Sequence, residues 1–324
     1  MHQAARIKNR TILAALMLLA SLGAAAAAAT KPPVVVATIR PLAALAAGVM
    51  EGVGNPLGLI PANQAPESFT LHRKDLDKLR QADLLFWAGP SLEAALARPL
   101  ANLEIGARII DLSDTAGLLI YQSRHGGEWE GPSAPAQPPP RGEGTTSPAV
   151  DGHFWLDADN AKLLIGRIAE VLTDVDFGNA ETYRANAARL RKQVDELDQQ
   201  VAAELAPLRD RAFLLLRDDL QYWEARYGLD AKGSIGLDEA PIPPARLEQI
   251  AAKIEATGAR CVIGTSAADG PPLAAIGKAT GVRTARIDPY GGAGGGAAFL
   301  GLLRSVADGY VECLGGGEKL TQRP

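Results

Sequence analysis

The stretch Asn179 to Leu205, NAETYRANAARLRKQVDELDQQVAAEL, decides the fold because it predicts one long helix in the middle of the chain. Its apolar residues recur mostly at spacings of three or four, the period of a helix with one buried face; they are Tyr183, Leu190, Val194, Leu197, Val201 and Leu205. Asn179 belongs to the residue types that cap helices. Such a helix is about 40 Å long, enough to cross a domain. A coiled coil is the alternative, but no second heptad segment exists to partner it, so we interpret the helix as an intramolecular strut.

Short apolar runs alternate with helical patterns on both sides of this helix. Before it, strands are predicted at Val34 to Ile39, Leu57 to Pro61, Leu84 to Trp87 and Ile109 to Leu112, with helices after Pro41 and over Leu71 to Ala82. After it, strands are predicted at Ala212 to Leu216, Cys261 to Ile263 and Thr284 to Ile287, with helices through Tyr222, over Arg246 to Thr257 and over Ala298 to Leu314. This alternation predicts an α/β fold with parallel sheets. We therefore expect two α/β lobes joined by a single long rigid helix, with a ligand cleft between them at the carboxyl ends of the strands.

The predicted division of the chain has four parts. They are a signal peptide at 1–29, an N-terminal α/β lobe at 30–177, a linking helix at 178–208 and a C-terminal α/β lobe at 209–324. Within the first lobe, residues 122–150 change to Pro, Gly, Ser, Glu and Arg, a composition that buries too little apolar area to order itself. We predict a flexible insertion there, in which His125 is solvated.

The first residues have the pattern of a secretory signal. A positive start at Arg6, Lys8 and Arg10 precedes the apolar run Ile12 to Leu22 and a small-residue cleavage region at Ala24 to Ala29. An uncleaved membrane anchor is the alternative, but the apolar run is short for a span. No cysteine near the cleavage region is available to take a lipid. We expect export to the periplasm of a Gram-negative cell.

Composition excludes several classes of function. The chain has 324 residues and a net charge of −4, and it has no basic patch interleaved with aromatic residues, so a nucleic-acid partner is not expected. Its two cysteines, Cys261 and Cys313, lack neighbouring ligands at zinc spacing, and in an oxidising compartment we expect a disulfide between them. Asp157 and Asp159 fit a helix cap better than an acid–base pair, and no enzyme activity is expected.

The stretch Asp151-Gly152-His153-Phe154-Trp155-Leu156-Asp157 carries the candidate binding residue, His153. The turn-forming Asp-Gly pair and the bulky aromatic neighbours would hold its imidazole by packing, as a metal ligand requires. By itself this signal is weak, since a histidine between aromatic residues is more often a hydrogen-bonded core residue.

Several segments together give a specific resemblance. They are Ala37 to Leu42, Ala82 to Pro90, Asp151 to Asp157, Tyr227 to Leu229 and Ile287 to Gly291. The chain resembles the periplasmic solute-binding proteins of zinc and manganese ABC importers, the zinc-uptake binding protein family, over essentially the whole mature sequence. The resemblance implies two lobes bridged by a rigid helix, a metal held between them, and delivery to an ABC permease of the inner membrane. It implies binding without bond chemistry, by a monomer, with zinc the expected metal and manganese the less favoured one.

The resemblance also assigns four ligand positions. The first histidine of the family is Glu67 here, the second is His153, the third is Arg217 and the final aspartate is Asp288. Glu67, His153 and Asp288 form a possible three-ligand metal site. Arg217 departs from the pattern because a guanidinium has no lone pair to offer and repels a dication.

Two arrangements remain open at this point. In one, Arg217 forms salt bridges to Glu67 and Asp288 in place of a metal, and the protein is a degenerate paralogue that binds a non-metal ligand or serves an interaction or regulatory role. In the other, Arg217 turns outward and leaves a three-ligand site with water. Asp218, next to Arg217, could compensate; His72 is expected at the surface. The glycine-rich stretch 291–296 lacks the Lys-Ser/Thr ending of a phosphate loop, and we interpret it as a hinge beside Asp288.

Overall fold

The computed structural model describes residues 31–103, 106–124, 127–128, 150–236, 241–291 and 296–316. The predicted signal peptide and His125 lie outside these ranges, as does most of the glycine-rich stretch 291–296 and most of the insertion. In the described part of the chain, no helix combines the length and apolar content needed to cross a membrane.

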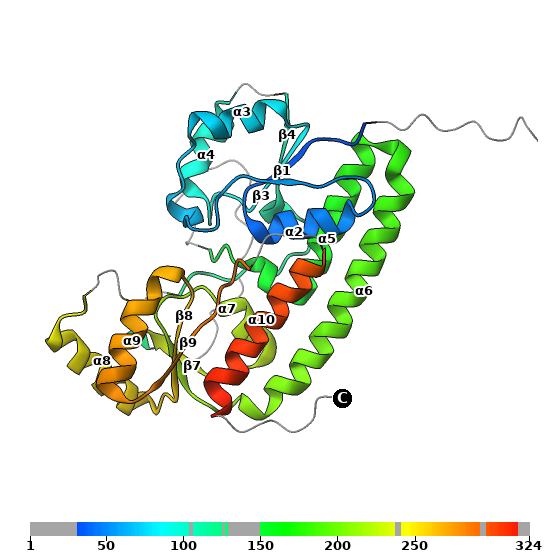
Figure 1. Cartoon of the computed structure of the whole chain (residues 1–324). Helices are drawn as coiled ribbons and strands as arrows, with labels where there is room; N and C mark the ends of the chain where they lie inside the picture. The colour runs from blue at the N-terminus through cyan, green and yellow to red at the C-terminus, as the bar shows by residue number, and fades with distance from the viewer. Residues whose placement is uncertain are drawn as a thin grey trace, which may run out of the picture. The chain divides into compact units, whose positions relative to one another are not determined.

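The first sheet has four parallel strands in the order β2-β1-β3-β4 (Figure 1). These are β1 (Val35–Ala37), β2 (Leu57–Gly58), β3 (Leu84–Trp87) and β4 (Arg108–Asp111). β1 and β3 are buried along their whole length, as expected of continuous apolar strands in a parallel sheet covered by helices. The helices of this region are α2 (Arg40–Val49), α3 (Arg73–Gln81) and α4 (Ala94–Ala101). Two 3-10 turns, η1 (Pro66–Ser68) and η2 (Leu112–Asp114), follow strands β2 and β4.

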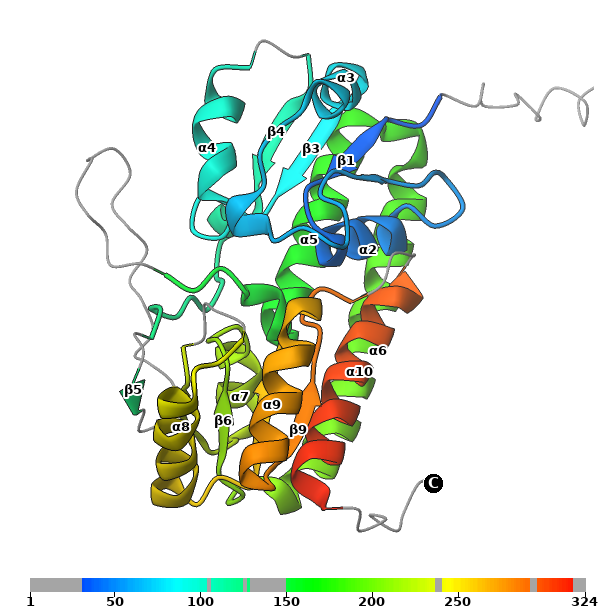
Figure 2. The same cartoon turned by 60° about the vertical axis from the view of Figure 1, so that its left-hand side comes forward.

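Two long helices, α5 (Ala158–Val175) and α6 (Ala180–Leu205), follow the first sheet and pack closely against each other (Figures 1 and 2). A 3-10 turn, η4 (Phe177–Asn179), joins them. The predicted long helix is thus confirmed, and Asn179 occupies its N-cap position as predicted. Its side chain makes no capping bond, however, and instead donates a hydrogen bond to Asp176 at 2.8 Å. Asp157 does cap α5, since its carboxylate accepts bonds from the first-turn N–H groups of Asp159 and Asn160.

The second sheet has five strands in the order β5-β7-β6-β8-β9. They are β5 (Gly127–Glu128), β6 (Phe213–Leu215), β7 (Ala231–Ser234), β8 (Cys261–Gly264) and β9 (Arg283–Arg286). Four of them are parallel, and the edge strand β5 is antiparallel to β7. The remaining elements are η5 (Ala206–Leu208), α7 (Gln221–Tyr227), α8 (Pro244–Thr257), η6 (Ala267–Asp269), α9 (Gly270–Thr280) and α10 (Gly296–Gly315). The expected α/β fold with two sheets is confirmed.

Cys261 on β8 and Cys313 on α10 form the predicted disulfide, with their Cα atoms 5.7 Å apart. Both residues are buried, so the bond fixes the last helix against the second sheet from inside the core.

The last helix also packs against elements of the first lobe. α10 runs alongside α6 and contacts α2, as Figure 2 shows. Gly48 and Gly296 meet at the crossing of α2 and α10: a Cβ added to Gly48 would lie 2.8 Å from the Cα of Gly296 and 2.7 Å from the Leu190 side chain. Two glycines let the helices approach this closely. α10 is therefore a second link across the lobes, beside the predicted helix α6.

The described residues at the two ends of the predicted insertion have defined places in the structure. Gln122 forms a bridge to Val150, and Gly127–Glu128 adds the edge strand β5 to the second sheet. The side chain of Arg124 is only 4% exposed. Buried ion pairs and strand pairing, rather than apolar area, hold these residues, and the flexibility predicted for residues 122–150 stays a prediction.

Candidate metal centre

His153 lies at the start of the 3-10 turn η3 (Phe154–Leu156) and is buried at 6% exposure. Asp151 holds it from the same turn. One carboxylate oxygen of Asp151 accepts the backbone N–H of His153 at 2.9 Å and the ring Nδ1–H at 2.7 Å. Gly152 is needed between them because an added Cβ would lie 2.6 Å from the Cβ of Leu92. The Asp-Gly-His sequence thus fixes the imidazole with Nε2 pointing away from Asp151.

The second ring nitrogen faces the loop after β9. His153 Nε2 lies 3.1 Å from the hydroxyl oxygen of Tyr290, and that hydroxyl lies 3.2 Å from Oε1 of Glu67. These contacts form a chain Asp151–His153–Tyr290–Glu67. Burial lowers the pKa of His153, but the charge and hydrogen bond of Asp151 outweigh burial and raise it to about 9. With both ring nitrogens protonated, Nδ1–H donates to Asp151, Nε2–H donates to Tyr290, and the Tyr290 hydroxyl donates to Glu67.

The loop after β9 is pinned to the His153 turn. The indole N–H of Trp155 donates to the carbonyl oxygen of Pro289 at 3.0 Å, and the Tyr290 ring packs against Trp155 and His153, with ring centroids 5.5 and 5.8 Å apart. The carboxylate of Asp288 accepts the backbone N–H of Tyr290 at 2.8 Å, which shapes the turn. Tyr290 therefore has a fixed position between the two lobes.

The three predicted metal ligands do not converge. Glu67, exposed on η1, and His153 both reach the Tyr290 hydroxyl, but Asp288 points elsewhere and pairs with Arg40 at 3.2 Å. Across the described residues, no three His, Cys, Asp or Glu side chains are grouped so that they could hold a metal ion.

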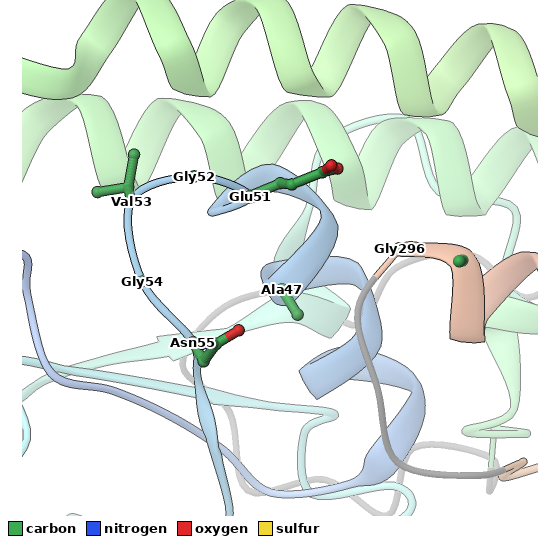
Figure 3. Close-up of a pocket in the computed structure, with 8 residues that line it drawn as sticks. Ala47, Glu51, Gly52, Val53, Gly54, Asn55 and Gly296 are labelled. Atoms are coloured by element: carbon green, nitrogen blue, oxygen red, sulfur yellow. The ribbon is translucent and has the colours of Figure 1, made fainter.

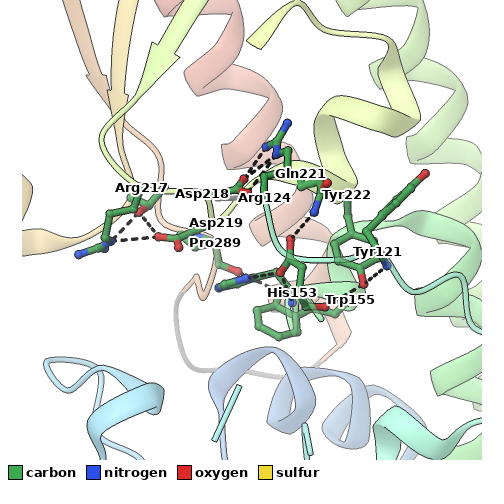
Figure 4. Close-up of polar contacts among 12 residues, drawn as sticks. Tyr121, Arg124, His153, Trp155, Arg217, Asp218, Asp219, Gln221, Tyr222 and Pro289 are labelled. Carbon is green, nitrogen blue, oxygen red and sulfur yellow. Dashed lines mark hydrogen bonds and ion pairs between the residues drawn. The ribbon is translucent and has the colours of Figure 1, made fainter. Parts of the chain in front are cut away.

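Arg217 does not bridge Glu67 and Asp288, which corrects the salt-bridge arrangement. Its guanidinium pairs with Asp219 at 3.4 Å and Asp269 at 3.8 Å, and donates to the hydroxyl of Thr265 at 3.2 Å. Figure 4 shows it directed away from His153. The charges of Asp219 and Asp269 outweigh partial burial and raise the pKa of Arg217. Asp219 and Asp269 lie nearer to the guanidinium than Glu67 and Asp288 do, and they decide its direction.

Asp218 turns to the opposite side and pairs with Arg124 (Figure 4). These two residues and Glu224 form a buried ionic cluster. Arg124 contacts Asp218 through two guanidinium nitrogens and Glu224 at 2.7 Å. Burial raises the pKa of Glu224 to about 7, with Arg124 opposing the rise and Asp218 adding to it. The cluster lies near the His153 turn, since Asp218 interacts electrostatically with Asp151 and His153. Gln221 on α7 donates both to Asp151 and to the backbone carbonyl of Gln122.

The other candidate positions lie away from His153. His72 is exposed at the N-terminus of α3, where its backbone N–H donates to Asp75 at 3.0 Å, so its predicted surface position is confirmed. A pocket beside the α2–α10 crossing is lined by Ala47, Glu51, Gly52, Val53, Gly54, Asn55, Gly296 and Ala297 (Figure 3). Among these lining residues only Glu51 is charged, and it pairs with Arg189 at 2.6 Å.

Comparison with known proteins assigns the chain to a family. Residues 35–313 match the family described as zinc-uptake complex component A, periplasmic. The chain belongs to this family. The resemblance inferred from the sequence segments is therefore confirmed, and the family is one of periplasmic proteins.

Named relatives and solved structures agree with this assignment. The chain is 32% identical over 304 residues to the high-affinity zinc uptake system protein ZnuA of Brucella abortus strain 2308, covering 86% of this chain and 91% of that protein. It is 31% identical over 299 residues to ZnuA of Paracoccus denitrificans, covering 87% and 91%. A crystal structure of ZnuA matches with a TM-score of 0.72 at 19% identity, covering 87% of this chain and 99% of that one. The periplasmic zinc binding protein TroA of Treponema pallidum matches with a TM-score of 0.69 at 19% identity and the same coverage. These structures confirm the fold.

Sequence reasoning missed four residues of this centre: Tyr290, Asp219, Gln221 and Arg124. Tyr290 lies within a segment that supports the resemblance, and Asp219 and Gln221 follow Arg217 directly, so their neighbourhood was visible in the sequence. No local pattern marks Arg124, which lies in a stretch of low-complexity composition.

Proposed function

We propose that this protein binds zinc through His153 and Glu67 and acts as the solute-binding component of an ABC importer, delivering the ion to a permease of the inner membrane. Membership of the zinc-uptake family supports this, and so do the names of the relatives. The observation that carries the proposal is the orientation of His153: Asp151 holds Nδ1, and Nε2 faces the Tyr290 hydroxyl, which in turn donates to Glu67. A carboxylate that orients a histidine in this way is a common outer partner of zinc ligands.

The charges around His153 are compatible with a dication. Arg217 is the residue expected to repel a metal, but Asp219 and Asp269 both lie within ion-pair distance of it. The charges of Asp219 and Glu67 both help to raise the pKa of His153, so two carboxylates besides Asp151 act on the imidazole. Zinc binding would require Nε2 to release its proton, since a ligand nitrogen must offer a lone pair.

The transport role leads to further proposals about partners. The protein works as a monomer that hands its metal to a permease with an ATPase behind it, and it performs no bond chemistry. Zinc is the expected cargo, and manganese is the competing ion to test, because the donor atoms near His153 include carboxylate oxygen as well as imidazole nitrogen.

Calorimetric titration of the chelator-treated mature protein with zinc and with manganese tests this function. We expect one-to-one zinc binding that His153→Ala abolishes, because the variant removes the only imidazole that faces Glu67 among the described residues. His72→Ala is the matched control, since His72 is exposed and is not one of the proposed ligands. Zinc binding that survives in His153→Ala, or no binding by the unmodified protein, would refute the proposal.

A further inference from the structure

We propose that Tyr290, instead of Asp288, is a metal ligand of this protein. This inference rests on the proposed zinc-binding function and specifies the donor set that performs it: His153 Nε2, a Glu67 carboxylate oxygen and the Tyr290 hydroxyl oxygen.

The first argument is spacing. A tetrahedral zinc site with bonds of 2.0 to 2.1 Å places neighbouring ligand atoms about 3.3 to 3.4 Å apart. The Tyr290 oxygen lies 3.1 Å from His153 Nε2 and 3.2 Å from Glu67 Oε1. The hydroxyl is thus within hydrogen-bond distance of both other atoms. A dication that coordinates the three atoms would replace the protons shared between them, and those protons would leave to solvent.

The second argument is exclusion. The Tyr290 hydroxyl lies directly against His153 Nε2, so an ion that binds this nitrogen must either coordinate the hydroxyl or displace it. Displacement would disturb a ring that packs against Trp155 and His153 and a turn that is held by Asp288 and by the Trp155 bond to Pro289. Coordination leaves all of these contacts in place.

The third argument concerns the alternative donors. Asp288 is paired with Arg40 and is occupied in shaping the turn, and Arg217 offers no lone pair. The carboxylates of Glu67 and Asp219 both act electrostatically on Tyr290, and these negative charges attract a dication.

Tyr290→Phe tests the assignment because it removes one oxygen and keeps the ring. Zinc affinity is measured by competition with a chelator, and copper(II) serves as a second probe, since a phenolate bound to copper gives a charge-transfer absorption band. We expect the variant to bind zinc about tenfold or more weakly and to lose the band that the unmodified protein shows. Tyr121→Phe is the control: it also removes one tyrosine hydroxyl, but Tyr121 meets the neighbours of the His153 turn through its backbone N–H, which donates to Tyr222, so the variant should change neither measurement.

The outcomes separate this inference from the proposed function. If the unmodified protein binds no zinc, both fail. If it binds zinc but Tyr290→Phe binds as tightly or more tightly, or if the copper complex of the unmodified protein lacks the band, Tyr290 is not a ligand and only this inference is overturned. Thermal unfolding of each variant confirms that the loss of affinity does not come from loss of the fold.

Discussion

Two arginines flank the candidate centre, and they differ in almost every physical respect. The Arg124 side chain is 4% exposed and lies between Asp218 and Glu224, whereas that of Arg217 is 42% exposed and pairs with Asp219 and Asp269 at longer distances. Both belong to charged groups of similar composition. The difference teaches that burial, rather than the number of ion pairs, decides how strongly a charge is tied into the structure.

The reason is desolvation. A buried guanidinium loses its hydration and must recover that free energy from its carboxylates, so removing one partner leaves an uncompensated buried charge. A half-exposed pair is screened by water and contributes little to stability. The sequence drew attention to Arg217 because of its ligand position, but the structure makes Arg124 the cation on which the fold depends.

The largest expected effect is that of Arg124→Ala. It leaves Asp218 and Glu224 buried without their cation, and we expect it to lower the free energy of unfolding by about 3 to 5 kcal/mol. Urea denaturation of the disulfide-intact protein measures this. The comparison would break down if Arg124→Ala lowered the free energy of unfolding by no more than Arg217→Ala does.

The next effect is a pH dependence within the buried cluster. The pKa of Glu224 is raised from its ordinary 4.5 to about 7 by burial, so its contribution to stability is fully present below about pH 4.5 and is lost as the pH rises through about 7. At about 1.4 kcal/mol for each pH unit, the loss is about 3 kcal/mol. Glu224→Gln should flatten the corresponding part of the stability profile, measured by urea denaturation from pH 4.5 to pH 8.

Glu93, a buried glutamate of the other lobe, provides a second test of this pH dependence. Burial raises its pKa to about 7 as well, but its carboxylate accepts the backbone N–H of Ala88 at 2.7 Å rather than facing an arginine. Glu93→Gln should remove a similar part of the fall in the free energy of unfolding with rising pH. The variant with both substitutions should remove the contributions of both glutamates. A wild-type profile that rises between pH 5 and 7 would contradict the assignment for both residues.

The smallest effect belongs to Arg217→Ala. We expect it to change the free energy of unfolding by less than about 1 kcal/mol, because its ion pairs are half exposed. It should also raise zinc affinity about threefold, since it removes a positive charge and frees Asp219 near His153. Chelator competition at two salt concentrations measures this change, and weaker zinc binding by the variant would mean that Arg217 supports the centre.

Much of the fold follows from local pattern, and the exceptions have local reasons. Helix α6 and the buried strands β1, β3 and β8 were predictable because continuous apolar runs and a period of 3.6 residues mark them. Strand β7 was missed because Ala-Lys-Gly-Ser has no apolar run; its neighbours β6 and β5 make it a strand. Helix α4 was missed as well, and it contains Pro99, a residue that disfavours helix interiors.

The sequence by itself determined the family, the two-sheet α/β fold, the disulfide and the buried position of His153, because each depends on residue type and spacing along the chain. Only the tertiary structure decided which charges meet. Tyr290 lies 137 residues from His153 and 223 residues from Glu67, and Asp288 lies 248 residues from its partner Arg40. Hydrogen bonds and ion pairs across such separations depend on the directions of side chains after packing and on which partner lies nearest. For that reason the sequence could single out Glu67, His153 and Asp288 as candidate positions, but it could not show which of their side chains come together.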